Sequence, residues 1–193
     1  DFLSNFFEAG IDYNGIHYLN NEAALDLSIS IPGGTKKVFP RTKGQSSLIL
    51  KMRSSDLVFA SGPAGSGKTF MLECVATEML KHNQVVCFKT AFELNELARL
   101  YHIGKSYDFA DCLNADILLI DDLGTEPVLK NVTKEYLYNI INTRQVNNLP
   151  TFISTNLSQE QLLDRYDERI YSRLANKNLS LNIQLTSTDK RIK

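Results

Sequence analysis

GPAGSGKT, at residues 62–69, is the stretch that decides the fold. A short apolar run at 57–60 precedes it, and a segment with helical spacing of apolar residues, 68–81, follows it. This order of strand, glycine-rich loop and helix is the context in which a P-loop binds phosphate. Glycines let several backbone N–H groups approach a phosphate closely, and the helix N-terminus adds partial positive charge. The stretch predicts a phosphate site; the alternative is a glycine-rich turn that caps a helix and binds nothing.

Two side chains of this stretch have predicted roles. The Lys68 ammonium is expected on the terminal phosphates, and the Thr69 hydroxyl is expected to hold Mg²⁺. The residues predicted to contact the nucleotide are Gly62, Pro63, Ala64, Gly65, Ser66, Gly67, Lys68, Thr69 and Phe70.

The apolar run ILLI at 117–120 ends in two carboxylates, Asp121 and Asp122. A buried strand does not favour such an end, because unpaired buried charges are costly unless a cation or hydrogen bonds compensate them. In P-loop enzymes the first carboxylate orders the Mg²⁺ shell and the next position can orient the attacking water. We therefore predict a metal role for Asp121 and a catalytic role for Asp122. The alternative is a strand that runs out into a polar turn at Gly124.

Four further polar residues are catalytic candidates. Asn156 ends the run at 151–155 and can bond the water or the γ-phosphate if that strand lies beside the P-loop strand; alone it could cap a helix or form a turn. Arg169 and Arg173 are four residues apart and share a helix face, which is either a solvated basic face or an arginine finger for a neighbouring subunit. Arg191 is a candidate for a similar role in cis.

Short apolar runs alternate with helical segments from Asp56 onward, which is typical of an α/β fold with a parallel sheet covered by helices. Ser158 and Gln161 form a capping box that predicts a single helix to about Leu174. The predicted strands are 57–59, 85–88, 117–120 and 151–154, with a half-exposed closing strand at 179–185, and the other predicted helices are 68–81, 91–101 and 133–146.

Composition excludes several classes of protein. The chain has 193 residues, of which 43% are hydrophobic and 22% charged, so one medium domain is expected rather than disorder. A net charge of −1 means that any nucleic-acid contact must be local. No apolar stretch is long enough to span a bilayer and no signal peptide opens the chain, so we expect a cytoplasmic protein.

Cysteine usage indicates neither a disulfide framework nor a metal centre. Cys74, Cys87 and Cys112 are odd in number, lack metal-ligand spacing and sit in or beside apolar runs. We expect buried, reduced thiols.

Turn-forming residues at 30–34 mark the best internal boundary. We expect an atypical N-terminal segment at 1–34 and an ATPase domain at 35–193.

Taken together, these motifs resemble the AAA+ helicase loaders of the DnaC/DnaI type, with the transposition helper IstB close behind. The resemblance spans about 62–193. It rests on six blocks besides the P-loop: FML at 70–72, TAFEL at 90–94, DILLIDDLGT at 116–125, ISTNLS at 153–158, ERIYSRL at 168–174 and DKR at 189–191.

The resemblance implies a three-layer αβα core with a five-stranded parallel sheet and a small or absent C-terminal lid. It implies that the strand before Asn156 lies between the P-loop strand and the Asp121 strand. It also implies that Arg173 is the favoured finger, Arg169 the second choice, and Arg191 a sensor-2 arginine.

For function, the resemblance implies an ATPase that uses ATP and Mg²⁺. Subunits would associate in the ATP state, hold single-stranded DNA and place a replicative DNA helicase, so a homo-oligomer is expected. The family's DNA contacts come from the segment that is 92–107 here. The candidates in or beside it are Lys89, Arg99, Lys105, Tyr101 and Tyr107.

Two other resemblances lie nearer the N-terminus. Residues 37–45, leading into 57–65, look like a PhoH-type NTPase, in which a glutamine placed like Gln45 often contacts the base. Residues 1–24 are similar to the opening of NADAR-type N-glycosidases, which implies a role for Glu22. The alternatives are therefore a PhoH-like NTPase acting on RNA, an IstB-like transposition ATPase, a NADAR-like enzyme, or a nucleotide-binding adaptor that does not hydrolyse.

Overall fold

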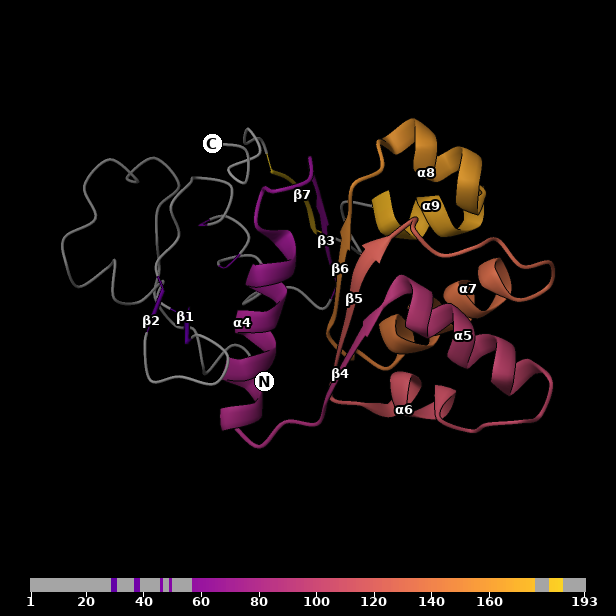
Figure 1. The fold of residues 1–193 in the computed structure, drawn as a ribbon, viewed down its shortest axis with the longest axis horizontal. Helices are drawn as coiled ribbons and strands as arrows, with labels where there is room; N and C mark the ends of the chain where they lie inside the picture. Colours follow the sequence, from indigo (N-terminus) through magenta and orange to yellow (C-terminus); the bar gives the residue numbers. More distant parts are fainter. Residues whose placement is uncertain are drawn as a thin grey trace.

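A five-stranded sheet in the order β4-β5-β6-β3-β7 forms the centre of the protein (Figure 1). The computed structural model describes residues 29–30, 37–38, 46, 49, 57–175 and 181–185. All neighbouring strands of this sheet pair in parallel. The strands are β3 (Leu57–Ser61), β4 (Val86–Thr90), β5 (Ile117–Leu123), β6 (Thr151–Thr155) and β7 (Leu181–Gln184). The predicted parallel sheet is confirmed, as is the position of β6 between β3 and β5.

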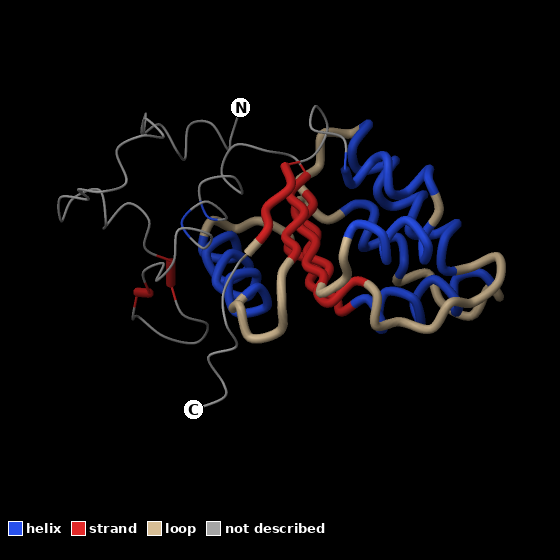
Figure 2. The backbone as a smooth tube through the Cα atoms, turned by 90° about the horizontal axis from the view of Figure 1, so that it is seen from above, coloured by secondary structure: helices blue, strands red, loops and turns tan. Residues whose placement is uncertain are grey.

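Helices cover both faces of the sheet, so the predicted three layers are confirmed (Figures 1 and 2). Helix α4 (Lys68–Lys81) lies on one face. The other face carries α5 (Ala91–His102), α6 (Phe109–Asn114), α7 (Thr133–Val146), α8 (Gln159–Tyr166) and α9 (Glu168–Ala175).

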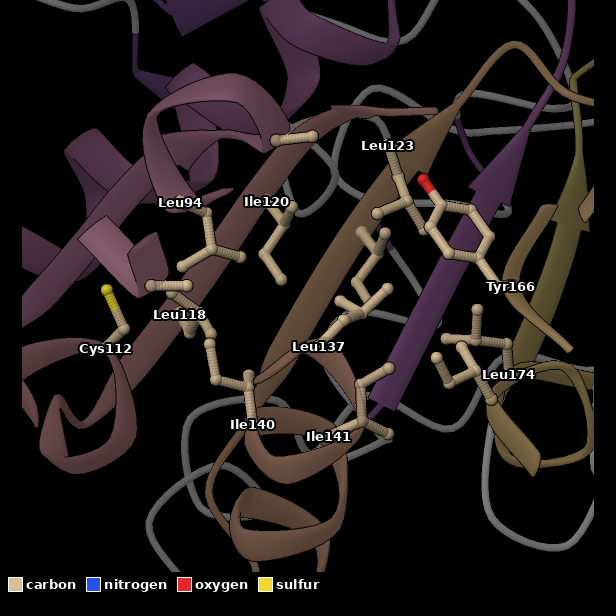
Figure 3. Packing of buried hydrophobic residues seen from close by; sticks show 14 of the residues in the cluster. Leu94, Cys112, Leu118, Ile120, Leu123, Leu137, Ile140, Ile141, Tyr166 and Leu174 are labelled. Carbon is tan, nitrogen blue, oxygen red and sulfur yellow. The ribbon is translucent and has the colours of Figure 1, made fainter. Parts of the chain in front are cut away.

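Alternation along each strand divides the interior into two cores. In β5, Leu118 and Ile120 face the helices α5 and α7, whereas Leu119 faces α4. The larger core contains Ile140 of α7 and Tyr166 of α8, and Figure 3 shows these side chains converging on the sheet. Because both faces are covered, the first four residues of β3 and of β5 are apolar and buried on both sides, which is the pattern that the sequence displayed.

The predicted helices 68–81 and 133–146 match α4 and α7, and 91–101 matches α5 to within one residue. The single helix predicted from Ser158 to about Leu174 is wrong, because the chain breaks at Asp167 with a φ of 75°. This left-handed backbone ends α8, and the Asp167 carboxylate accepts hydrogen bonds from the N–H groups of Arg169 and Ile170 at the start of α9. Aspartate is a common cap for this reason.

Sequence reasoning also missed α6, which is too short to display a helical period. Phe109 and Cys112 bury its inner side against the larger core. Of the three cysteines, Cys74 and Cys112 are buried as expected, whereas Cys87 is only half-buried, and none forms a disulfide.

A second, two-stranded sheet pairs β1 (Ile29–Ser30) with β2 (Lys37–Val38) in antiparallel fashion. The predicted boundary at 34, the lid, and the candidates Glu22, Gln45 and Arg191 lie outside the described residues. The longest described helices, α4 and α7, have 14 residues, fewer than the roughly 20 that cross a bilayer, so none of the described helices spans a membrane.

Arg144 stabilises the end of the sheet at which β5 and β6 begin, opposite the end that carries the P-loop. Its side chain is 0% exposed. The guanidinium donates to the carbonyl oxygens of Ala115 at 2.8 Å and Pro150 at 2.9 Å, and to the Thr151 hydroxyl at 2.9 Å. Burial lowers its pKa to about 10, so it remains a cation at neutral pH. One side chain thus ties the end of α6 to the amino ends of β5 and β6.

We expect Arg144→Met to lower the free energy of unfolding by at least about 3 kcal/mol, because it leaves several buried carbonyl groups without a donor. Urea denaturation measures the change. The control Arg99→Met removes an arginine whose partner Glu96 is also partly exposed, and should change stability by less than about 1 kcal/mol. Equal losses in the two variants would contradict this role of Arg144.

Candidate nucleotide site

The P-loop connects β3 to α4 at the carboxyl edge of the sheet, where β5 and β6 also end (Figure 1). Gly67 precedes the first residue of α4 and has a φ of 88°, a left-handed conformation that glycine adopts at little cost. The N-terminus of α4, where the first backbone N–H groups have no partner within the helix, therefore faces the loop, which is the arrangement that binds anions.

The Lys68 side chain turns back into the P-loop. Its Nζ donates to the carbonyl oxygens of Gly62 at 2.8 Å and Pro63 at 3.0 Å, and to the Ser66 hydroxyl at 3.2 Å. The side chain is buried. The ammonium therefore lies inside the concave loop, close to any phosphate that the backbone would hold.

Thr69 and Asp121, the two predicted metal ligands, lie together although 52 residues separate them. The Thr69 hydroxyl donates to Asp121 Oδ1 at 3.2 Å. The Ser154 hydroxyl of β6 donates to the same carboxylate oxygen. Asp121 is buried. Hydrogen bonds from both neighbours thus fix a buried carboxylate at the first turn of α4.

Asp122 points out of the strand because the backbone changes direction there. Its φ is 55°, and the pairing of β5 with β6 shifts register between Ile120 and Leu123. The Asp122 N–H donates to the Ser154 hydroxyl at 2.9 Å, and Asn156 Nδ2 donates to Asp122 Oδ1 at 3.2 Å. The structure therefore brings the candidates Asp122 and Asn156 into contact.

Gly62 must be glycine because β7 approaches it closely. A Cβ at this position would lie 2.5 Å from the Leu185 carbonyl oxygen. The Leu185 N–H in turn donates to the Ser61 carbonyl at 2.7 Å. Leu185, directly after β7, thereby holds the end of β3 at the point where the P-loop begins.

A cleft of 870 Å³ opens beside the P-loop. It is lined by Gly62 and Pro63 of the P-loop, by Asn156 after β6, and by Tyr171 and Leu174 of α9. Pockets of about 300–1,000 Å³ are typical for small molecules of nucleotide size. Phe70, predicted to contact the nucleotide, is exposed on α4 and is not among the residues that line this cleft.

Arg169 and Arg173 pack on α7 of their own chain. Their guanidinium carbons lie 4.9 Å and 4.6 Å from the centre of the Tyr138 ring. Arg173 also donates to the Tyr138 hydroxyl at 2.9 Å and to Asn142 Oδ1 at 2.8 Å. Within the described part of the chain, no hydrogen bond or ion pair joins either arginine to the P-loop or the aspartate pair. In this structure both arginines therefore contact α7 rather than the nucleotide site.

Sequence reasoning missed Ser154, which bonds both aspartates. A signal was available, because a serine inside an otherwise apolar buried strand needs a partner. Its partner follows from strand order: once β6 lies beside β5, Ser154 sits next to the Asp121 end. The strand order was expected from the resemblance, whereas the bond between Ser154 and Asp121 also depends on the register in which β5 and β6 pair.

Glu126 was also missed, and it is 3% exposed. Its carboxylate accepts hydrogen bonds from the Gly124 N–H at 2.9 Å and from the Tyr166 hydroxyl, and Arg165 Nε lies 3.5 Å away. These contacts join the turn after Asp122 to the last turn of α8. No sequence pattern marked this glutamate, since its side-chain partners Arg165 and Tyr166 are 39 and 40 residues away.

The residues fit a magnesium nucleotide. Thr69 and Asp121 supply neighbouring hydroxyl and carboxylate oxygens, the ligand type that Mg²⁺ prefers, and Mg²⁺ usually takes its remaining ligands from phosphate and water. Lys68 and the start of α4 supply positive charge for phosphates.

Solved structures share this fold. The DnaC helicase loader matches with a TM-score of 0.62 and 24% identity, over 77% of this chain and 94% of that one. The replication initiator DnaA bound to AMPPCP and single-stranded DNA matches with a TM-score of 0.58 and 22% identity, over 74% and 44%. The chain therefore has the three-layer α/β fold around a P-loop that these structures have. The expectation of this fold is therefore confirmed.

Sequence comparisons point to two groups of relatives. The replicative helicase loader DnaI of Bacillus subtilis (strain 168) is 27% identical over 111 residues, which is 54% of this chain and 34% of DnaI. The family model described as PhoH-like protein matches residues 37–100, where the PhoH-like resemblance was expected. The chain thus spans about a third of the length of DnaI, and the match to the PhoH-like model ends before Asp121.

The contacts of Glu126 predict its effect on stability. Glu126→Gln replaces one carboxylate oxygen by an NH₂ group, which then faces the donor of either Gly124 or Tyr166, and we expect the free energy of unfolding to fall by about 2 kcal/mol. Chemical denaturation tests this. Glu73→Gln, at an exposed position in the middle of α4, is the matched control and should change stability by less than about 0.5 kcal/mol. An unchanged stability of Glu126→Gln would contradict the network.

Proposed function

We propose that this protein binds and hydrolyses ATP as an assembly switch of the replicative helicase loader type. The carrying observation is the chain of hydrogen bonds that runs from Thr69 through Asp121, Ser154 and Asp122 to Asn156 beside the P-loop. The similarities to DnaI and DnaC support the replication role.

We assign a role to each of the main residues in this hydrogen-bonded series and to Lys68. Thr69 and Asp121 would hold Mg²⁺, which when bound neutralises charge on the phosphates. Asp122 would orient the attacking water, with Asn156 fixing the orientation of its carboxylate. Lys68 would neutralise the terminal phosphates from inside the loop.

The positions of the arginines support the proposed assembly. Arg173, with Arg169 second, would reach the γ-phosphate of a neighbouring subunit, since in its own chain it lies against Tyr138. The γ-phosphate then acts as a ligand that stabilises one interface, and hydrolysis removes that ligand. The same reasoning supports a homo-oligomer in the ATP state.

Single-stranded DNA is the proposed nucleic-acid partner, and α5 with the loop after it is its proposed surface. Tyr107 is 78% exposed, and Tyr101 packs against it edge to face with ring centres 6.4 Å apart. Exposed rings can stack on bases without reading sequence. Lys105 is exposed nearby in sequence, whereas Arg99 is engaged by Glu96 at 2.8 Å.

Two variants separate nucleotide binding from hydrolysis. We expect Lys68→Ala to weaken ATP binding by about 10- to 100-fold, because it removes a charged hydrogen bond. Asp122→Asn should bind ATP normally and lose turnover by at least about 100-fold. Calorimetry and phosphate release measure the two effects, with Asp164→Asn on the exposed side of α8 as control. Undiminished turnover in Asp122→Asn would contradict its role.

Arg173→Ala tests assembly. It should keep ATP affinity, lose ATP-dependent assembly and lose turnover by at least about 100-fold. Light scattering with AMPPCP, with ADP and with a single-stranded oligonucleotide measures assembly. Asn142→Ala is the matched control, because it removes the acceptor on α7 but leaves the arginine, and it should assemble normally. A wild-type monomer under every one of these conditions would overturn the proposed switch.

A PhoH-like NTPase acting on RNA is the second candidate, and the family-model match to 37–100 favours it. It predicts turnover stimulated by RNA and not by single-stranded DNA. Stimulation by single-stranded DNA alone would count against it.

A further inference from the structure

Cys87 and Cys112 form a thiol pair that takes no part in the proposed ATPase mechanism. Their sulfur atoms lie 3.4 Å apart, although the residues are 25 positions apart in the chain. Cys87 belongs to β4, the edge strand of the sheet, and Cys112 belongs to α6, which packs beside it (Figure 1). The two sulfurs therefore face each other across a contact between a strand and a helix.

Two contacts hold this pair in place. Arg144 Nη1 donates to the Cys112 carbonyl at 3.1 Å and to the Ala115 carbonyl at 2.8 Å, so the end of α6 cannot shift freely. Cys87 is fixed by the pairing of β4 with β5, where it lies opposite Leu118. A disulfide needs the sulfurs to approach to about 2.0 Å, which a small side-chain rotation can supply from this distance.

The electrostatic surroundings favour reaction at Cys87. The hydrogen-bonding contact with the Cys112 thiol, together with the positive charges of Lys89 and Arg144, lowers the pKa of Cys87. Burial and the same contact raise the pKa of Cys112. Cys87 is half-buried and Cys112 is fully buried. A half-buried thiol with a lowered pKa beside a second thiol is the arrangement found in redox-sensitive cysteine pairs.

We infer that Cys87 and Cys112 are a redox-active pair that hydrogen peroxide converts into a reversible disulfide, which fastens α6 to the edge strand β4. The Cys87 thiolate attacks peroxide, the O–O bond breaks, and the departing hydroxide takes up a proton to leave water and a sulfenic acid. The Cys112 sulfur then attacks the Cys87 sulfur, the S–O bond breaks, and the Cys112 proton leaves with hydroxide as a second water. Two thiols are oxidised and one peroxide is reduced to two waters.

Cys74 is the internal control. It is buried on α4, in the core on the other face of the sheet, and burial raises its pKa to about 11. Its environment therefore disfavours the thiolate. The same protein molecule thus carries one thiol pair expected to react and one thiol expected to stay reduced.

The test treats the wild-type protein with equimolar hydrogen peroxide, then blocks free thiols after unfolding and maps the peptides by mass spectrometry. We expect a Cys87–Cys112 linked peptide that dithiothreitol releases, with Cys74 fully alkylated. Hydrogen exchange of the α6 amides should slow in the oxidised protein, since the helix is then tied to β4. Absence of the linked peptide, oxidation of Cys74 at the same rate, or unchanged exchange in α6 would overturn the inference.

Single serine variants identify the attacking thiol. Cys112→Ser should leave a sulfenic acid at Cys87 that reacts with dimedone, whereas Cys87→Ser should leave Cys112 unmodified. Circular dichroism checks that each variant is folded. Dimedone labelling of Cys112 in the Cys87→Ser protein would contradict the assigned order.

Discussion

The structure depends on a short series of hydrogen bonds at the carboxyl edge of the sheet. Ser154 of β6 donates to Asp121 and accepts from the Asp122 N–H, while Thr69 at the start of α4 donates to Asp121. A buried carboxylate is stable only when such donors or a cation satisfy it. The same bonds that stabilise the fold therefore fix the groups that would hold a metal and a water.

A different set of hydrogen bonds stabilises the other end of the sheet, where β5 and β6 begin. Arg144 donates to carbonyl oxygens from α6 and from the residues that lead into β5 and β6, and it is fully buried. Glu126 connects the turn after Asp122 with the end of α8. The two charged groups thus link the sheet to the helices on its larger core.

The helices that follow β6 are joined to the site indirectly. Asp167 ends α8 and caps α9, so α9 takes a new direction and its arginines meet Tyr138 of α7. An unbroken helix, as the capping box predicted, would not change direction at this point. The break is caused by the positive φ of one residue, Asp167. A helical spacing of apolar residues does not reveal such a local change of backbone conformation.

The sequence by itself determined the strand, loop and helix around 62–69, the apolar strands and most helix limits, because local propensity and the burial of both sheet faces leave their mark in neighbouring residues. It also marked Asp121, Asp122 and Asn156, since polar residues at the ends of buried strands need hydrogen-bond partners or a bound cation. Only the tertiary structure decided that Ser154 bonds both aspartates, that Glu126 meets Tyr166, and that Cys87 faces Cys112. Each of these contacts joins residues 25 to 40 positions apart, so strand register and helix packing decide it and no local pattern records it.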